Sequence, residues 1–400
     1  MSLTRWSQIT IAAWALAACG GEPRGSDASG TDSSRVLAVS TTAADSAGTT
    51  ASVRTTVSAG QVATRRDTGD YPVVRALYMN RFAAQSWRKM NRMFALADTT
   101  EINGFVIDIK DEFGLNYKSD KPELARNAGN THGRIPNLKA LLDSMKAHNL
   151  YSIARIVVFK DSAAAANNPA WTIKTPDGSQ WKDEKGNAWV NPYDRNVWEY
   201  NLGVAEEMAR AGFDEIQFDY IRFPEPYRRL APQVFPGAGP LKKHDLLTEF
   251  LKAAQARLHP LNVLVTADIF GLVTTVKGPL EVGQWWEKIS PYVDVVLPMV
   301  YPSHYPRGAY GIARPNAEPY AVLKFALDGA RKRDVALGIT RAEHVRPWVQ
   351  AFSIGQPEYT AEHVAAQIKA IYGVGYNGWI LWSPGSRYDA FVPAFAKTDP

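Results

Sequence analysis

From residue 71 onward, short runs rich in Val, Ile and aromatic residues alternate with amphipathic stretches of helical length. Apolar runs bounded by turn residues predict strands, and apolar residues three to four positions apart predict helices. The predicted strands are residues 73–78, 104–110, 152–159, 215–221, 263–269, 293–300, an extended segment within 336–352, and 378–382. The predicted helices are residues 84–96, 137–148, 195–211, 244–258, 282–288, 320–332 and 361–372.

Eight strands alternate in strict order with these seven helices, and the sequence supports a short eighth helix after the last strand only weakly. This order predicts an α/β fold, a single (β/α)8 TIM barrel with elaborated loops after its strands. The alternative is an open, doubly wound sheet. That architecture is less well supported, because residues 79–82, after the first predicted strand, read MNRF and contain no Gly-rich dinucleotide turn. The barrel is expected to occupy residues 71–397.

The amino terminus has the pattern of a lipoprotein signal. Arg5 precedes a short apolar run at residues 9–18, and the sequence LAAC ends at Cys19, the only cysteine in the chain. The run is too short to span a bilayer as a helix, so it reads as a secretory signal peptide over residues 1–18. LAAC resembles the lipobox of bacterial lipoproteins, which predicts lipidation of Cys19 and a location in the cell envelope, on the periplasmic or outer surface. An ordinary signal peptide that contains a cysteine is the alternative.

Residues 19–70 form the second segment, which is mostly Ser, Thr, Ala, Gly and Asp and contains no aromatic residue. Such a composition cannot bury enough apolar surface to offset its ordering entropy. It predicts a flexible tether between the lipid anchor and the barrel.

Several function classes are disfavoured by what the sequence lacks. A net charge of +5 over 400 residues is mild for a nucleic-acid-binding protein, and one cysteine excludes an intramolecular disulfide framework. The chain contains no His-Glu-x-x-His, Gly-x-Ser-x-Gly or phosphate-loop pattern. We therefore expect no metal, no cofactor and no nucleic-acid partner, and we expect a monomer.

The strongest candidates for chemistry are carboxylates near the carboxyl ends of predicted strands, where TIM barrels place their active sites. Asp219 lies near the carboxyl end of the alternating run 215–221, and Asp268 occupies the corresponding place in the next strand. A carboxylate in an apolar strand is costly to bury unless it is paired or used. Neighbouring strands lie about 4.8 Å apart, which suits the two carboxyl groups of a glycosidase. The alternative is that Asp268 only orients a neighbouring group.

Three further charged residues are predicted at the same end of the barrel. Asp108 and Lys110 alternate onto one face of their strand and could form an inward pair. That pair would either contact substrate or serve as a buried structural ion pair. Arg222, just past Asp219, could hold an anionic substrate group.

Aromatic residues supply candidate surfaces for sugar stacking. Tyr301 and Trp382 follow or end strands, where a flat ring could stack on a pyranose face. The long connection after the third strand carries Trp171, Trp181 and Trp189 between turn signals, which predicts a small hairpin. For Trp171 and Trp189, packing inside the loop is an equally good interpretation.

Five stretches resemble the bacterial putative glycoside hydrolase domain family. They are residues 104–110 (GFVIDIK), 213–224 (FDEIQFDYIRFP), 298–302 (PMVYP), 346–350 (RPWVQ) and 378–382 (GWILW). The resemblance implies a barrel distantly related to retaining glycosidases, with Asp219 at the position that such barrels use as nucleophile or acid. By the same analogy Asp268 is its partner. Strand ends that carry the second acid in some glycosidase clans have no carboxylate here, and the last one carries Trp382.

The combined expectation is a membrane-anchored glycosidase that cleaves a polysaccharide or envelope glycan. Asp219 and Asp268 are the predicted catalytic residues, and Asp108, Lys110, Arg222, Tyr301 and Trp382 are the predicted substrate-binding residues. The alternative is a carbohydrate-binding barrel of the cell envelope without catalytic activity.

Overall fold

The computed structural model describes Gly69, residues 71–129 and residues 134–397. The predicted signal peptide, the predicted lipidation site Cys19 and all of the predicted tether except Gly69 lie outside the described residues.

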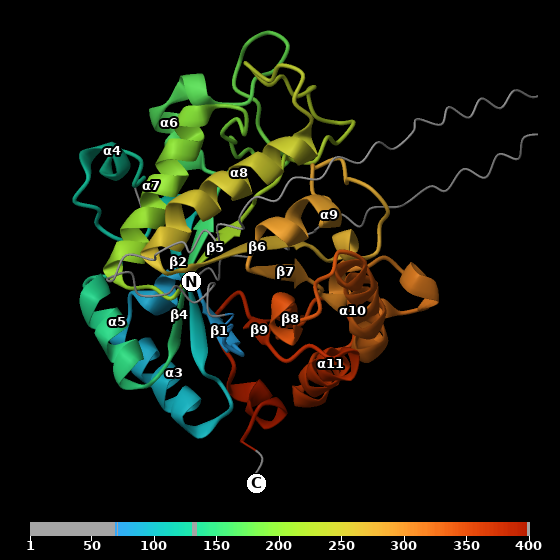
Figure 1. Cartoon of the computed structure of the whole chain (residues 1–400). Coiled ribbons are helices and arrows are strands. Elements are labelled where there is room, and N and C mark those ends of the chain that lie inside the picture. Colours follow the sequence, from blue (N-terminus) through green and yellow to red (C-terminus); the bar gives the residue numbers. More distant parts are fainter. Residues whose placement is uncertain (1–68, 70, 130–133, 398–400) are drawn as a thin grey trace, which may run out of the picture. The chain divides into compact units, whose positions relative to one another are not determined.

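Eight parallel strands form a closed barrel (Figure 1). They are β1 (Arg75–Met79), β2 (Gly104–Asp111), β4 (Tyr151–Val157), β5 (Glu215–Asp219), β6 (Leu264–Phe270), β7 (Val295–Met299), β8 (Trp348–Gln350) and β9 (Trp379–Trp382). β1 pairs with both β2 and β9, which closes the sheet on itself. A two-residue strand, β3 (Gly114–Leu115), adds antiparallel to β2. The predicted (β/α)8 architecture is confirmed.

Helices lie between the strands and surround them, as Figure 1 shows. They are α2 (Arg81–Ala84), α3 (Trp87–Thr99), α4 (Pro122–Ala125), α5 (Leu138–Ala147), α6 (Ser162–Asn167), α7 (Arg195–Ala211), α8 (Lys243–Leu258), α9 (Trp286–Ile289), α10 (Pro319–Ala336) and α11 (Ala361–Val374). α7 has the predicted bounds because both of its ends are capped. Asp194 accepts a hydrogen bond from the Asn196 backbone N–H, and Gly212 adopts the left-handed conformation that ends many helices, with φ +106°.

The predicted helix at residues 282–288 is mostly wrong. α9 begins only at Trp286 and has four residues. Gly283 has φ +89°, which a helix does not accommodate. The Gln284 side chain accepts a hydrogen bond from the Phe270 backbone N–H and donates to the Ile221 carbonyl oxygen. These contacts hold the segment as a loop against the ends of β5 and β6.

Apolar side chains form two clusters. The larger one packs the outer faces of the strands against the helices. The smaller one fills the barrel interior and comprises Val74, Ala76, Tyr78, Val106, Ile153, Val295, Leu297, Tyr301, Trp348 and Ile380. The interior is therefore a packed core, as expected of a barrel with eight strands.

A buried ion pair crosses the barrel near the amino ends of the strands. Arg346, just before β8, donates from Nη1 to both carboxylate oxygens of Glu215 on β5, at 2.9 and 3.0 Å. Thr266 on β6 donates to the same carboxylate at 2.9 Å. Because β5 and β8 are not neighbours in the sheet, this contact passes through the interior.

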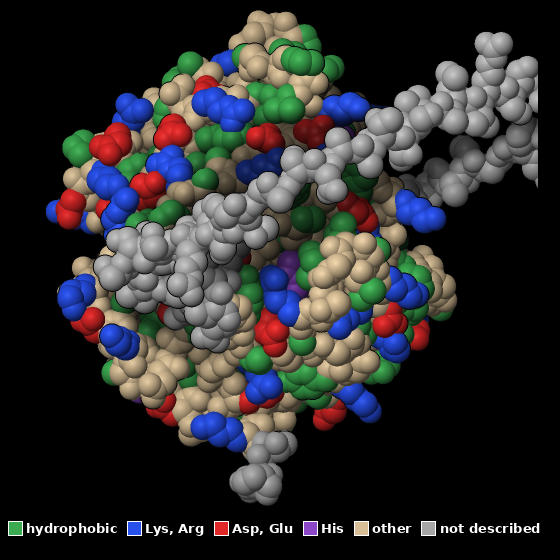
Figure 2. All heavy atoms as spheres, in the orientation of Figure 1, with side chains coloured by type: hydrophobic (Ala, Val, Ile, Leu, Met, Phe, Trp, Pro, Cys, Tyr) green, Lys and Arg blue, Asp and Glu red, His purple; other side chains and the backbone are tan. Residues whose placement is uncertain are grey.

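On the face shown in Figure 2, acidic and basic side chains of the described residues are intermixed. In the part of the chain that the structure describes, no helix combines the length and apolarity needed to cross a membrane.

Candidate active site

Arg155 is the centre of the candidate site. It lies on β4, and its side chain is only 12% exposed. Its guanidinium donates through Nη1 to Oδ1 of Asp108 at 2.5 Å, and through Nε and Nη2 to Oδ2 of Asp219, the Nε distance being 3.0 Å. Nε also lies 3.9 Å from Oδ2 of Asp268. Three aspartates from three strands therefore surround one cation.

The two predicted catalytic carboxylates lie on this shared group. Asp219 is the last residue of β5, and Asp268 lies on the neighbouring strand β6. Register brings them to the same level, since Phe218 pairs with Ala267. Asp219 is 6% exposed and Asp268 is 1% exposed, so Asp219 is the more accessible of the two.

Asp268 is held by two donors besides the nearby guanidinium. Gln217 Nε2 donates to its two oxygens at 3.0 and 2.9 Å, and Trp348 Nε1 donates to Oδ1 at 2.6 Å. Burial raises the pKa of Asp268 well above its usual range, and the neighbouring Asp219 raises it further. Arg155, Trp348 and Gln217 act in the opposite direction. The net effect favours the protonated carboxyl group, which is the form that can donate a proton.

Asp219 has the opposite surroundings. Two guanidinium N–H groups of Arg155 donate to Oδ2, and the Tyr220 backbone N–H donates to Oδ1 at 2.5 Å. Charge-assisted donors of this kind stabilise a carboxylate anion. The two carboxyl groups therefore have different hydrogen-bonding surroundings.

Asp108 lies on the other side of Arg155. The Tyr78 hydroxyl donates to its Oδ2. Burial raises the pKa of Asp108, and the adjacent Arg155 and the Tyr78 hydroxyl oppose that shift. The structure thus brings Asp108 into the site beside the two catalytic candidates.

An aromatic wall borders the carboxylates. The rings of Tyr301 and Trp382 lie 4.8 Å apart at 35°, and Phe352 packs against Trp382 edge-on at 4.9 Å. Trp382 and Phe352 are half-buried. Burial raises the pKa of Tyr301, and the nearby Asp268 and Asp219 add to that shift. The two predicted stacking residues therefore lie together beside the carboxylates.

The predicted inward pair of Asp108 and Lys110 is wrong. Lys110 is fully buried and its Nζ lies 2.8 Å from Oδ2 of Asp161, while a second bond goes to the Val157 carbonyl oxygen. The register between β2 and β4 shifts between Asp108 and Lys110, so the alternation assumed for this strand breaks there. Because its ammonium is paired with Asp161 and the Val157 carbonyl oxygen, Lys110 is a structural cation and not a substrate-binding residue.

Arg222 lies just past β5, at the carboxyl end of the barrel. Its guanidinium carbon is 4.9 Å from the Tyr220 ring centroid, 4.7 Å from that of Phe270 and 5.0 Å from that of Trp189. Nη1 donates to Glu225 Oε2 at 2.9 Å. Arg222 is therefore enclosed by aromatic rings rather than joined to the aspartate cluster.

The hairpin predicted after the third strand forms from isolated antiparallel bridges, Thr172 with Val190, Lys174 with Gln180 and Lys182 with Ala188. Trp181 and Trp189 are each 1% exposed and belong to the main core cluster. For Trp189 the loop-packing interpretation is therefore the correct one. Trp171 is half-buried and packs at the edge of the same core.

Sequence reasoning missed Arg155 and Trp348. Arg155 lies between Ala154 and Ile156 in β4, so it is a charge within an apolar strand, the same signal that identified Asp219. Trp348 lies in the stretch 346–350, which resembles the glycoside hydrolase domain family, but no sequence pattern links its indole to Asp268.

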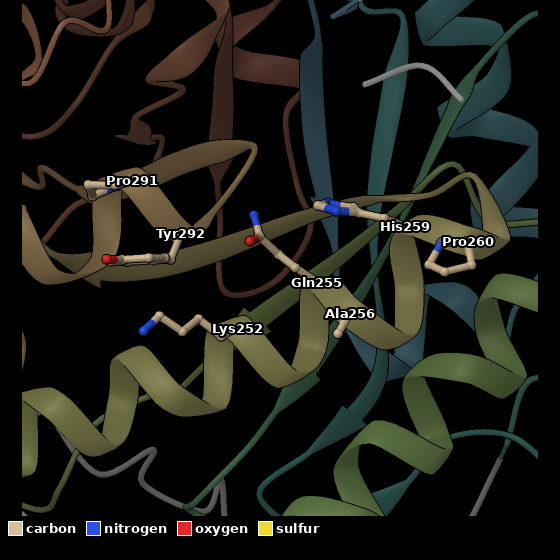
Figure 3. A pocket seen from close by; sticks show the side chains of 7 residues that line it. All are labelled: Lys252, Gln255, Ala256, His259, Pro260, Pro291 and Tyr292. Carbon is tan, nitrogen blue, oxygen red and sulfur yellow. The ribbon is translucent and has the colours of Figure 1, made fainter. Parts of the chain in front are cut away.

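A shallow pocket lies elsewhere (Figure 3). It is lined by Lys252, Gln255, Ala256, His259, Pro260, Pro291 and Tyr292, from the end of α8 and the 3-10 segment Ser290–Tyr292. His259 pairs with Asp294, which immediately precedes β7. The pocket is therefore at the amino ends of the strands, opposite the aspartate cluster, and is not part of the candidate site.

Comparisons with known proteins identify the family and the fold of the chain. A family model described as "Putative glycosyl hydrolase domain" matches residues 76–388. Among curated protein sequences there is no match. The glycoside hydrolase domain of PgaB (BpsB) from Bordetella bronchiseptica is 13% identical, with a TM-score of 0.56, over 81% of this chain and 98% of that chain.

Two further solved structures are similar. Chitobiase from Flavobacterium johnsoniae is 10% identical, with a TM-score of 0.51, over 81% of this chain and 47% of that chain. A hypothetical protein from Ruminiclostridium thermocellum is 34% identical over 48% of this chain and 96% of that chain, with a TM-score of 0.44. At their low identities, the Bordetella and Flavobacterium structures show a shared fold.

Proposed function

The chain belongs to the family described as "Putative glycosyl hydrolase domain", and from this premise we propose that it hydrolyses glycosidic bonds of a polysaccharide or envelope glycan with Asp219 and Asp268. The observation that carries the proposal is the convergence of both carboxyl groups on Arg155 at the carboxyl end of the barrel. This is the end at which TIM barrels perform catalysis.

In the proposed reaction, Asp268 is the general acid. Its protonated carboxyl group gives its proton to the glycosidic oxygen as the bond to the anomeric carbon breaks. Asp219 is the anion, which either attacks the anomeric carbon or takes a proton from the attacking water. Arg155 donates two hydrogen bonds to Oδ2 of Asp219 and fixes the direction of that carboxylate.

The aromatic wall positions the sugar. The half-buried ring of Trp382 lies beside the carboxylates with the buried Tyr301 ring packed against it, and a pyranose face can stack on the Trp382 ring. Asp108 lies within the same cluster and is the remaining candidate for a contact with a sugar hydroxyl.

The direct test uses Asp219→Asn on a panel of bacterial polysaccharides, with the release of new reducing ends as the readout. The wild-type chain should release reducing ends from at least one glycan. The variant should lose at least about 10³-fold in kcat while it keeps its circular dichroism spectrum and still binds that glycan. Turnover retained by the folded variant would remove Asp219 from the mechanism.

A second candidate function is carbohydrate binding without catalysis. It is favoured by the saturation of the carboxylates, since Asp268 already accepts from Gln217 and Trp348 and both aspartates contact Arg155. Glycan binding by the wild-type chain with no reducing-end release from any bound glycan would support this function over hydrolysis.

We also propose that Cys19 anchors the protein in the cell envelope through a lipid. The LAAC sequence that ends at Cys19 supports this. Replacing Cys19 by Ala should move the protein from the membrane fraction to the soluble fraction and abolish incorporation of labelled palmitate. Unchanged fractionation of the variant would rule out the anchor.

A further inference from the structure

Lys160 is a buried cation without a partner. It follows β4 by three residues and is 7% exposed. Within residues 71–129 and 134–397, its ammonium forms no hydrogen bond and no ion pair, and its one close contact is the Tyr220 ring, 5.0 Å from Nζ to the centroid. The Nζ atom of Lys160 remains accessible to solvent. A desolvated ammonium normally acquires a counter-charge, so an open one at this depth indicates a place for a ligand.

Arg222 lies on the same ring. Its guanidinium carbon is 4.9 Å from the Tyr220 centroid. Only Nη1 is engaged, by the Phe223 carbonyl oxygen and Glu225, and the adjacent Nε and Nη2 groups have no partner among the described residues. Nε and Nη2 form the side of a guanidinium that binds a carboxylate through two parallel hydrogen bonds.

In the described part of the chain, the acidic groups nearby form no ion pair with Lys160. Burial lowers the pKa of Lys160, but Tyr220, Glu112 and Asp183 raise it, and the net shift is upward. Asp183 is already occupied, because its carboxylate accepts from the backbone N–H groups of Lys185 and Asn187 and from the Trp189 indole. Two cations therefore share one aromatic ring, and neither the Lys160 ammonium nor Nε and Nη2 of Arg222 has a hydrogen-bond or ion-pair partner among the described residues.

This cation pair adjoins the carboxylates of the candidate site. Tyr220 directly follows Asp219, and it has φ +48°, a left-handed conformation that is uncommon for a residue other than glycine. The Val158 backbone N–H donates to the Asp219 carbonyl oxygen, which places the segment leading to Lys160 beside the end of β5. Phe270, which packs on Arg222, lies two residues past Asp268.

We propose that Lys160 and Arg222 form a subsite for the carboxylate of an acidic sugar, next to the bond that is cleaved. The ammonium supplies a point charge and three donors, while Nε and Nη2 of Arg222 supply the paired donors. The inference rests on the proposed function, and it narrows the substrate to a glycan that contains uronic acid units.

The test uses oligosaccharides in matched pairs, one member with its uronate carboxylate and the other with that carboxylate reduced to a hydroxymethyl group. Binding to the full chain is measured on a glycan array and then by titration calorimetry. The carboxylate member should bind at least about 10-fold more tightly, since hydrogen bonds to a charged group are strong. The ratio should fall as salt concentration rises.

Substitutions test whether Lys160 causes the preference for the oligosaccharide that carries the carboxylate. Lys160→Met should bring the affinity ratio of the two members close to one, and Lys160→Arg should keep most of it. Lys185→Met, an exposed lysine of the neighbouring hairpin, should leave the ratio unchanged. If Lys160→Met does not fold, Arg222→Met and the salt dependence of the wild-type ratio provide the same test.

The outcomes are distinguishable. Equal binding of the two members by the wild-type chain, or a preference that survives both Lys160→Met and Arg222→Met, would overturn the subsite and leave the proposed function intact. Absence of binding and of hydrolysis for every oligosaccharide would overturn both.

Discussion

The indole Nε1 of Trp348 donates a hydrogen bond to Oδ1 of Asp268 at 2.6 Å, from a strand that is not adjacent to β6. The bond crosses the barrel interior and orients a carboxyl group whose pKa is raised by burial. Together with Gln217 it fixes the direction of Asp268 before any sugar arrives. Pre-organisation of this kind is what a general acid requires.

Asp268→Asn should affect substrates according to their leaving groups. A glycoside whose leaving group needs protonation should lose about 10² to 10⁴-fold in kcat/KM. An aryl glycoside of an acidic phenol leaves without a proton and should lose less than about 10-fold by the same argument. Steady-state kinetics on such a pair checks this. Equal losses on both substrates would mean that Asp268 only orients its neighbours.

Trp348→Phe should move the upper limb of the pH–rate profile. The indole N–H lowers the pKa of Asp268, so its removal raises that pKa further and keeps the acid protonated to higher pH. The limb should therefore shift toward alkaline pH. Trp286→Phe is the matched control, because it removes a buried indole bond to Asp334 away from the site. Identical shifts in both variants would contradict the assignment.

Trp382→Ala should weaken glycan binding by about 5-fold, the equivalent of about 1 kcal/mol for the loss of one stacking surface. Trp382→Phe should keep most of the affinity, since it retains a ring against Tyr301. Trp87→Ala removes an exposed tryptophan of α3 and should change nothing. Isothermal titration calorimetry with an oligosaccharide that the wild-type chain binds measures the affinity of all three variants. Unchanged affinity in Trp382→Ala would exclude Trp382 from the sugar surface.

Lys110→Met should reduce stability rather than substrate affinity. It leaves the carboxylate of Asp161 buried and unpaired, which costs about 3–5 kcal/mol in the free energy of unfolding. Lys139→Met breaks an exposed pair with Asp143 and should cost less than about 1 kcal/mol. Denaturant unfolding and the KM of the folded fraction separate the two effects. A changed KM with full stability would return Lys110 to the substrate-binding set.

His344 should make the barrel sensitive to acid. Burial lowers its pKa to about 3, so between about pH 6.5 and 3 the unfolded chain binds a proton that the folded chain does not. Stability should therefore fall as pH falls, by about 2–3 kcal/mol from this residue between pH 6.5 and 4.5. His344→Gln should flatten this dependence in pH-dependent denaturant unfolding.

Asp334, which like His344 is hydrogen-bonded to the Ser290 hydroxyl, affects stability with the opposite sign. Burial raises its pKa to about 6, so its contribution to stability is lost as pH rises through that value. The wild-type chain and the His344→Gln variant both retain Asp334. The difference between their curves of unfolding free energy against pH therefore measures the contribution of His344. Parallel profiles would contradict the prediction.

Most of the fold was predictable because each strand is an apolar run and each helix has its own periodicity. All eight predicted strand positions contain an observed strand, although β8 occupies only three residues of the long segment assigned to it. The helix at residues 282–288 failed because side-chain contacts of Gln284, which sequence spacing cannot show, hold a loop there.

The candidate site was predictable only in part. Alternation along single strands singles out Asp219, Asp268 and Asp108 because each is a carboxylate in an apolar context. Contacts between strands are invisible to that reasoning, so Arg155 as their common partner was missed. Lys110 was misassigned because a register shift breaks the alternation on which its position depended.

The ion pair between Arg346 and Glu215 bears on the route by which water would reach the carboxylates in the proposed hydrolysis. Both side chains are almost completely buried and they lie across the amino-terminal end of the interior, with Thr266 alongside. Solvent therefore has no route upward through the core. In the proposed hydrolysis, the attacking water then enters from the same side as the sugar chain, so departure of the leaving group and entry of water are linked events.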